Sequence, residues 1–300
     1  MKLKDFMYFA GFGAKTILFR KKEPILGTII LTDYCNLSCK HCAVNNINKI
    51  IYPYEEIRAE MQSLYNDGVR ILFFCGGETL LWKDGERTIR DLVKEAKEIG
   101  FLIVNIVTNG TIDLDLPEAD VIFLSLDGLK ENHNYIRGNT FDTIMDKVSK
   151  AHKSNICVYM AVNNKNYKDI EGVCRLVKDN PNLKSISFNL HTPYEGTENL
   201  TLSEGEKVEV INEISRMIDQ GYPVFNLKSA LKYHLTNKWE RPCHQCLVSE
   251  GGKRYICGRC IEIEGLCEKC GYLFVNEFTL LCKGNIKVLF DMLKTYLRYV

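Results

Sequence analysis

The sequence predicts an α/β fold in which a parallel sheet is built from alternating strands and helices. Two observations support this. Between residues 25 and 190, short β-rich runs alternate with amphipathic helical stretches. Polar motifs also follow the expected strands, where parallel sheets gather functional groups. Either a partial barrel or an open doubly wound sheet satisfies this pattern. A third feature is a cysteine-rich stretch near the C-terminus, which predicts a small metal-binding unit.

The expected elements follow in order along the chain. The strands are expected at residues 25–31, 69–75, 101–107, 121–126, 156–162 and 183–190. Helices are expected at residues 54–67, 86–99, 141–153, 167–178 and 202–220. Gly68 and Gly100 end the first two helices. Because a helix separates most consecutive strands, right-handed crossovers and parallel pairing are expected.

Three regions divide the chain: a basic amphipathic segment at 1–24, the parallel α/β unit at 25–225, and a cysteine-rich region with a C-terminal helix at 226–300. The 300 residues are 46% hydrophobic and 26% charged, as in ordinary globular proteins. The net charge of +1 gives no nucleic-acid footprint, so no nucleic-acid partner is expected.

The first 22 residues are unusually basic. The segment contains six cationic residues and one carboxylate, Asp5. Its net charge is therefore +5, and that of the rest of the chain is −4. Its phenylalanines and leucines suit a membrane surface, so peripheral membrane contact through residues 1–22 is one expectation. The alternative is a helix that caps the bottom or open side of the sheet. The segment is too short to span a bilayer and lacks a signal-peptide cleavage site, so a cytoplasmic location is expected.

Three of the 13 cysteines lie close together directly after the first strand, as Cys35, Cys39 and Cys42. In a reducing compartment, clustered cysteines indicate metal ligands and not disulfides. Three thiolates can hold three irons of a four-iron cluster and leave the fourth iron open. A structural zinc site normally has a fourth protein ligand, so zinc is the weaker alternative here. Cys75, Cys157 and Cys174 are scattered and are expected to be core residues.

Further motifs stand at the ends of the following strands. They are Gly76-Gly77-Glu78, Thr108-Asn109-Gly110, Ser125-Leu126-Asp127-Gly128, Asn163-Asn164 and His191. Each motif taken alone is an ordinary turn sequence. Their shared position at strand ends is what indicates one common site.

Together these motifs resemble those of the radical S-adenosylmethionine (radical SAM) superfamily. The C-x3-C-x2-C loop, Gly76-Gly77-Glu78 and Thr108-Asn109-Gly110 resemble the family's motifs in order, with Thr79 where the family has proline. Ser125 to Gly128, followed by His133 and Arg137, resembles the branch that includes peptide-modifying and sulfatase-maturing enzymes. The resemblance covers about residues 25–191. It implies a partial (β/α)6 TIM-like barrel with a small C-terminal cysteine-rich unit.

The resemblance also implies the chemistry. A [4Fe-4S] cluster on Cys35, Cys39 and Cys42 would bind S-adenosylmethionine and cleave it to a 5′-deoxyadenosyl radical that abstracts hydrogen from a substrate. Gly76, Gly77 and Glu78 are then expected near the methionyl ammonium, and Ser125 and Arg137 near its carboxylate. Asn163 is expected at the ribose, and Tyr34 and His41 at the adenine. The alternatives are a plain turn at Gly76-Gly77 and a surface ion pair at Arg137.

Seven further cysteines lie within 40 residues. They are Cys243, Cys246, Cys257, Cys260, Cys267, Cys270 and Cys282. The segment from Gly252 to Cys257 resembles the auxiliary-cluster extensions called SPASM domains, although the later spacing departs from that pattern. The resemblance implies one or two auxiliary iron–sulfur clusters, and paired zinc sites are the alternative.

A SPASM-like extension implies a peptide or protein side chain as the substrate and a flavodoxin or ferredoxin as the electron donor. The basic N-terminal segment leaves a lipid or membrane-associated substrate as an alternative. A second alternative is a non-catalytic iron–sulfur or zinc protein for electron transfer or scaffolding, which would leave Glu78, Ser125 and Arg137 without a role.

Overall fold

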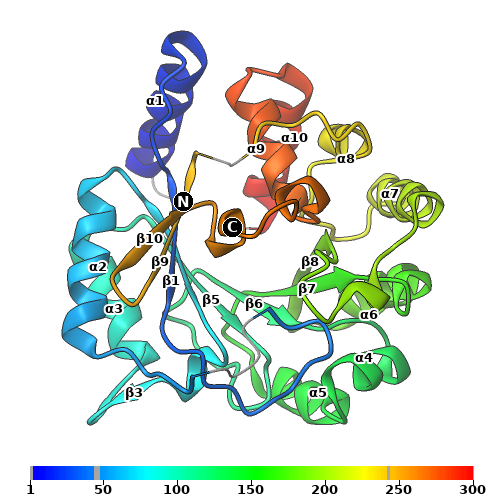
Figure 1. Cartoon of the computed structure of the whole chain (residues 1–300), viewed down its shortest axis with the longest axis horizontal. Coiled ribbons are helices and arrows are strands. Elements are labelled where there is room, and N and C mark those ends of the chain that lie inside the picture. The colour runs from blue at the N-terminus through cyan, green and yellow to red at the C-terminus, as the bar shows by residue number, and fades with distance from the viewer. Residues whose placement is uncertain (1–2, 44–47, 242–243, 300) are drawn as a thin grey trace.

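Six parallel strands form the centre of the fold in the computed structural model, which describes residues 3–43, 48–241 and 244–299 (Figure 1). The strands are β1 (Leu26–Ile30), β2 (Ile71–Cys75), β5 (Ile103–Thr108), β6 (Val121–Ser125), β7 (Ile156–Val162) and β8 (Leu183–Leu190). They are hydrogen-bonded in chain order, and every neighbouring pair is parallel. A doubly wound sheet would reverse this order at a switch point. The partial barrel is therefore confirmed.

Helices cover the outside of this curved sheet (Figure 1). They are α2 (Tyr54–Asn66), α3 (Ile89–Ile99), α4 (Lys130–Arg137), α5 (Phe141–Lys150), α6 (Ile170–Asp179) and α7 (Glu204–Asp219). The largest apolar cluster lies between these helices and the sheet, with Leu64, Leu92 and Phe188 fully buried. Each expected strand is present, and β7 and β8 have the expected bounds.

Three of the expected helices differ at their ends, and the one expected from residue 167 begins as a short 3-10 helix, Tyr167–Asp169, before α6. The helix expected from residue 86 begins at Ile89, because β3 (Lys83–Asp84) and β4 (Arg87–Thr88) form a short hairpin first. The helix expected to end at 153 ends at Lys150. Helix α4 was not expected, because its eight residues are mostly polar and show no clear apolar period.

The C-terminal region extends the barrel sheet. Strand β9 (Cys246–Glu250) pairs in parallel with β1, and β10 (Lys253–Ile256) pairs antiparallel with β9. Gly251 and Gly252 both have positive φ, as a tight hairpin turn requires. This hairpin covers the edge of β1, which would otherwise expose unpaired backbone groups.

Helices from both ends of the chain pack together against the barrel. They are α1 (Leu3–Phe19), α8 (Lys228–His234), α9 (Leu273–Cys282) and α10 (Ile286–Tyr299). Tyr8, Phe9 and Phe12 of α1 pack on a cluster that contains the first residues of β1, β2 and β5. The Tyr8 hydroxyl donates to the Gly68 carbonyl just before β2, at 3.4 Å. The expected capping helix is therefore present. Among the described residues, no helix is both long and apolar enough to cross a membrane.

Candidate active site

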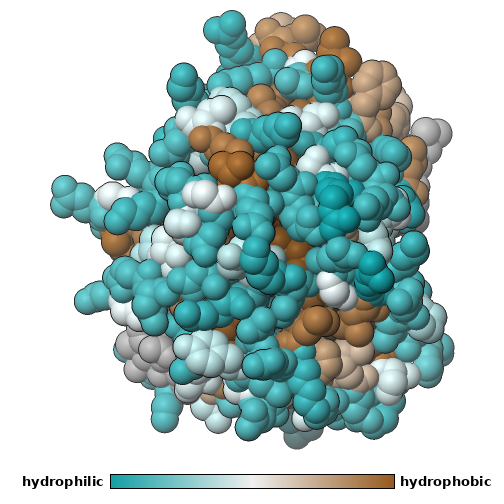
Figure 2. Space-filling model, turned by 90° about the vertical axis from the view of Figure 1, so that its right-hand side faces the viewer, coloured by the Kyte–Doolittle hydropathy of each residue, from teal (hydrophilic) through white to brown (hydrophobic). Residues whose placement is uncertain are grey.

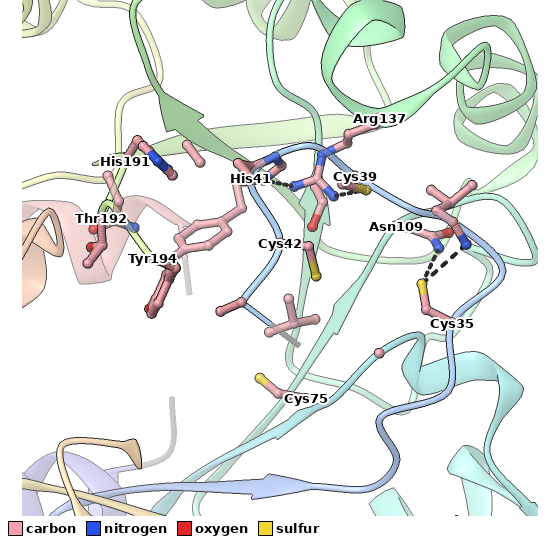
Figure 3. A pocket seen from close by; sticks show the side chains of 18 of the residues that line it. Cys35, Cys39, His41, Cys42, Cys75, Asn109, Arg137, His191, Thr192 and Tyr194 are labelled. Atoms are coloured by element: carbon pink, nitrogen blue, oxygen red, sulfur yellow. Dashed lines mark hydrogen bonds between the residues drawn. The ribbon is translucent and has the colours of Figure 1, made fainter. Parts of the chain in front are cut away.

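Loops at the carboxyl ends of the barrel strands line one cavity (Figure 3). Eight of the residues expected at the site from sequence line it: Cys35, Cys39, His41, Cys42, Gly76, Gly77, Ser125 and Arg137. They come from the segments after β1, β2 and β6. Because these strands are parallel neighbours or lie close in the barrel, their ends meet. The structure thus brings together most of the expected site.

The cysteine triplet occupies the loop after β1. The Cys35 sulfur accepts from the Leu37 amide at 3.4 Å and from the Asn109 side chain at 3.8 Å. The Cys42 amide donates to the Cys39 carbonyl at 3.2 Å, which makes a tight turn. All three side chains are partly exposed. The triplet therefore faces the cavity from one short loop.

Burial raises the pKa of the Cys35 thiol and raises that of Cys39 to about 11. The Arg137 guanidinium opposes this at Cys39, with its Nη1 atom 3.8 Å from the Cys39 sulfur. Thiolate charges on Cys35 and Cys42 would also disfavour ionisation of Cys39. A metal centre that neutralises the three thiolates removes this mutual repulsion.

No three or more His, Cys, Asp or Glu side chains converge on one metal-ion position within the described ranges. An iron–sulfur cluster does not need such convergence, because each thiolate binds a separate iron. The donor set fits a four-iron cluster in a second respect. The His41 Nδ1 atom is buried beside the triplet without a hydrogen-bond partner. Buried polar atoms normally have a partner, and a group bound in this space would supply one.

The Gly76-Gly77 pair is explained by close approach to the cysteine loop. A Cβ atom on Gly76 would lie 2.3 Å from the Thr32 carbonyl oxygen, and one on Gly77 would lie 2.2 Å from that of Tyr34. The Gly77 amide donates to the Thr32 carbonyl at 2.7 Å. Glycine is needed here because any side chain would push this backbone away from the cysteine loop.

Glu78 holds neighbouring strand ends together. Its fully buried carboxylate accepts from the Thr108 hydroxyl at 2.6 Å and from the Asn109 amide at 2.7 Å. Burial raises its pKa, and these two hydrogen bonds oppose the rise. Glu78 does not line the cavity. The backbone of Gly76 and Gly77 is the part of this motif that does.

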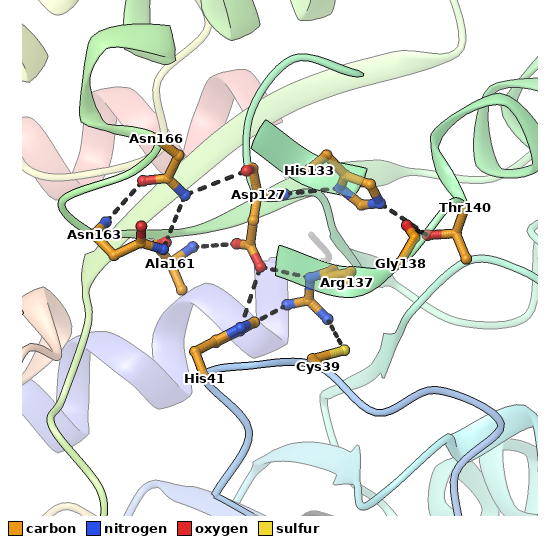
Figure 4. A network of polar contacts seen from close by, with 10 residues as sticks. All are labelled: Cys39, His41, Asp127, His133, Arg137, Gly138, Thr140, Ala161, Asn163 and Asn166. Atoms are coloured by element: carbon orange, nitrogen blue, oxygen red, sulfur yellow. Dashed lines mark hydrogen bonds and ion pairs between the residues drawn. The ribbon is translucent and has the colours of Figure 1, made fainter. Parts of the chain in front are cut away.

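A buried ion pair lies beside the triplet (Figure 4). Arg137, the last residue of α4, donates from Nε to Asp127 Oδ2 at 2.5 Å. The His41 Nε2 atom is 3.3 Å from both Asp127 Oδ2 and Arg137 Nη2. Asp127 Oδ1 also accepts from the Ala161 amide at 2.8 Å. Arg137 is therefore fixed with its guanidinium between the buried Asp127 carboxylate and the Cys39 sulfur, and it is not a surface ion-pair residue.

The charges of this group follow from its surroundings. Burial raises the pKa of Asp127, but the Arg137 guanidinium, His41 and the hydrogen bond from the Ala161 amide together outweigh burial and lower this pKa below its ordinary value. Burial lowers the pKa of His41 to about 4, with a further contribution from Arg137. At neutral pH the group therefore consists of one carboxylate, one guanidinium and a neutral imidazole.

Like Glu78, the expected contact residues Tyr34 and Asn163 lie outside the cavity wall. Tyr34 is 37% exposed and does not line the cavity. The Asn163 side chain is fully buried, where it donates to the Ala161 carbonyl at 3.3 Å and accepts from the Lys165 amide at 2.9 Å. Contacts from these two side chains to a bound adenosine remain a prediction.

The opposite wall contains residues that sequence reasoning missed. Cys75 and Tyr159 lie on inward-facing strand positions, and Cys75 is therefore not the plain core residue that was expected. In β2 and β7 these inward positions alternate with buried outward positions. That alternation was the feature of the sequence from which their place in the cavity could have been predicted. Tyr194 and Tyr272 meet with their hydroxyls 3.3 Å apart. Tyr272 comes from the C-terminal region, and nothing in the sequence places it there.

The C-terminal cysteines fall into two places. Burial raises the pKa of the Cys270 thiol to about 12. Cys257 and Cys260 lie close enough that negative charge on them raises this pKa further. Cys282, at the end of α9, lines a separate cavity with His244 and Gln245. The remaining members are Cys246, buried at the start of β9, and Cys267, in a short 3-10 turn with Lys269. Cys243 lies outside the described residues.

Comparisons with known proteins agree with this geometry. The family model of the radical SAM superfamily matches residues 29–177. A 7,8-dihydro-6-hydroxymethylpterin dimethyltransferase from Methanocaldococcus jannaschii is 29% identical over 83% of this chain and 56% of its own length. The sporulation killing factor maturation protein SkfB from Bacillus subtilis is 31% identical over 50% of this chain and 38% of its own. The chain thus spans about half the length of these relatives or less.

The fold also resembles that of solved structures. SuiB from Streptococcus suis, in a crystal structure bound to its precursor peptide SuiA, superposes with a TM-score of 0.66 at 15% identity. The match covers 94% of this chain and 70% of SuiB. At this identity the likeness concerns the fold.

Proposed function

The chain belongs to the radical SAM superfamily, and from this premise we propose that it abstracts hydrogen from a peptide or protein side chain. The observation that carries the proposal is the cysteine triplet after β1, which faces the ends of the other strands across one cavity. When bound, the [4Fe-4S] cluster and S-adenosylmethionine of this family supply a radical that removes a hydrogen atom.

The protein's own groups would position the methionyl end of S-adenosylmethionine. The backbone carbonyls of Gly76 and Gly77 lie at the cavity wall and can accept from an ammonium. Ser125, at the end of β6, and Arg137 line the same cavity and can donate to a carboxylate. Asp127 would hold Arg137 in place, since it takes the Nε donor and leaves the two terminal nitrogens directed at the cluster loop.

The peptide substrate is supported by two similarities. SkfB is a maturation protein, and the SuiB structure contains its precursor peptide. The SPASM-like region would hold one or two auxiliary iron–sulfur clusters next to Tyr272, which already lines the cavity. A flavodoxin or ferredoxin would supply electrons. Zinc in place of the auxiliary clusters, and a lipid substrate, remain the alternatives from the sequence.

A second candidate is a small heterocyclic substrate, because the pterin dimethyltransferase aligns over 83% of this chain. Turnover measurements separate the two. The protein, reconstituted with iron and sulfide under anaerobic conditions, is reduced with S-adenosylmethionine alone, with a tryptic digest of cytosolic protein, or with 6-hydroxymethyl-7,8-dihydropterin. We expect the peptide mixture to accelerate 5′-deoxyadenosine formation. Acceleration by the pterin alone would overturn the peptide proposal.

A further inference from the structure

The outward face of α1 is almost entirely apolar. Phe6, Met7, Leu18 and Phe19 are exposed on it, with Leu18 at 73% and Phe19 at 71%. Among the side chains of α1 that the structure describes, from Asp5 on, the other exposed positions are alanine or glycine, apart from Lys15. A helix in contact with water normally carries charged residues on its outer face. Its packed face, with Tyr8 and Thr16, is already used against the barrel.

The outward face of α10 has a related pattern. Ile286, Phe290 and Leu297 follow one another at helical spacing and are exposed, Leu297 at 82%. Lys287 and Lys294 are exposed next to this stripe. The opposite face packs on α8 and α9 through other apolar residues. The exposed stripe of Ile286, Phe290 and Leu297 is therefore not used for packing within the fold.

The two faces belong to one end of the molecule. Gly284, in the turn between α9 and α10, lies so close to Ile17 of α1 that an added Cβ would be 3.0 Å from it. Figure 1 shows α1 and the α9–α10 turn at the same end, and Figure 2 shows hydrophobic surface gathered at that upper end. At this end Tyr8, Phe9 and Phe12 of α1 pack with the first residues of β1, β2 and β5.

The exposed charges that the two helices themselves carry have one sign, although Glu240 lies near Arg20 and Lys283. Among the described side chains, every exposed charged residue of the two helices is a lysine or arginine. Arg20 and Lys283 add to them where the helices meet. The two carboxylates of the helices, Asp5 and Asp291, are only partly exposed, and Asp291 accepts from the Ser229 amide at 2.7 Å.

We propose that this surface, formed by the outward faces of α1 and α10, binds the headgroup region of an anionic lipid bilayer. Apolar stripes flanked by cations are the pattern of helices that lie in a membrane interface. A contact with another protein, including a second copy of this chain, would instead favour a core depleted of lysine. The anionic headgroups match the one sign of charge, and long lysine side chains can reach them while the apolar residues enter the acyl boundary.

The test uses the full chain and sedimented vesicles. One set of vesicles contains equal parts of phosphatidylcholine and phosphatidylglycerol, and the other contains phosphatidylcholine alone. We compare the wild type with Phe19→Ser/Phe290→Ser and with Lys287→Glu/Lys294→Glu. Val208→Ser, an exposed apolar residue on α7, is the matched control. Circular dichroism checks that each variant is folded.

We expect the wild type and the control to sediment with anionic vesicles and to be released by high salt. Each double variant should lose at least about tenfold in bound fraction. Equal binding of all variants, or no binding to anionic vesicles, would overturn the proposal. A wild-type dimer in light scattering that the Phe19→Ser/Phe290→Ser variant abolishes would also overturn it, since a second copy would then cover the surface.

Discussion

The two groups of cysteines in this chain are held in different ways. Cys35, Cys39 and Cys42 lie in one loop that β1, β2 and β6 surround. The described C-terminal cysteines are spread over β9, two short 3-10 turns, α9 and the loop positions Cys257 and Cys270. A site in one strand-end loop depends on local spacing, whereas the C-terminal arrangement depends on how several elements pack. The first group can therefore be identified from sequence more fully than the second.

The largest effect should come from removing one member of the triplet. Cys39→Ala leaves two thiolates, which cannot hold a four-iron cluster with one open iron. We expect it to lose the triplet's share of bound iron while the C-terminal share is retained. Iron and sulfide per chain after anaerobic reconstitution measure this. Cys157→Ala, a buried thiol in β7, is the matched control. Wild-type iron content in Cys39→Ala would contradict the assignment.

The next largest effect should come from the ion pair beside the triplet. Arg137→Met leaves the Asp127 carboxylate buried without its partner, which should lower the free energy of unfolding by about 3–5 kcal/mol. Urea denaturation measures this. Arg175→Met, in an exposed pair with Glu171, should cost less than about 1 kcal/mol. Adding Asp127→Asn to Arg137→Met should recover much of the loss, and no recovery would show that the charge is not the cause.

Substitutions at two glycines should affect the triplet and the C-terminal region separately. A Cβ on Gly77 would lie 2.2 Å from the Tyr34 carbonyl oxygen, and one on Gly271 would lie 2.0 Å from that of Leu190. Each alanine substitution should destabilise the protein by about 1–3 kcal/mol. We expect Gly77→Ala to reduce iron bound by the triplet and Gly271→Ala to reduce metal bound by the C-terminal region.

The control for these variants is Gly205→Ala in α7, where an added Cβ meets nothing within 4 Å. It should not lower the free energy of unfolding, since alanine in a helix is favoured over glycine by about 0.5–1 kcal/mol, and it should leave the metal content unchanged. If Gly77→Ala and Gly271→Ala reduced metal in both regions equally, the two sites would not be separate.

The last effect depends on pH and concerns the attachment of the C-terminal region through α9. Burial raises the pKa of Glu277 to about 7, although its carboxylate accepts from the Leu227 amide at 3.1 Å. The folded state thus favours the protonated form. This contribution to stability is complete below pH 4.5, the ordinary value, and is lost as pH rises through about 7.

Between these limits the loss should be at most about 1.4 kcal/mol per pH unit. Urea denaturation at a series of pH values measures it. Glu277→Gln should flatten this dependence, and Glu268→Gln, an exposed glutamate, should not. An unchanged slope in Glu277→Gln would assign the pH dependence to another group.

The limits of sequence prediction follow the same division. Strand positions were predictable because β7 is a continuous apolar run and β8 has apolar residues at alternate positions from Ile186 to Leu190. The contact between Arg137 and Asp127 was not predictable, because α4 has no apolar period. The position of α4 depends on how it packs in the folded chain. The β9–β10 hairpin was missed because its pairing with β1 joins residues more than 200 apart. Tyr272 reaches the cavity only through that tertiary arrangement.

The central claim is that the triplet carries the chemistry of this chain. The most direct measurement is 5′-deoxyadenosine formed from S-adenosylmethionine by the anaerobically reconstituted and reduced protein. The wild type and Cys157→Ala should form it, and Cys39→Ala should form none. Absence of 5′-deoxyadenosine from a wild-type sample with a full complement of iron, or undiminished formation by Cys39→Ala, would contradict the account.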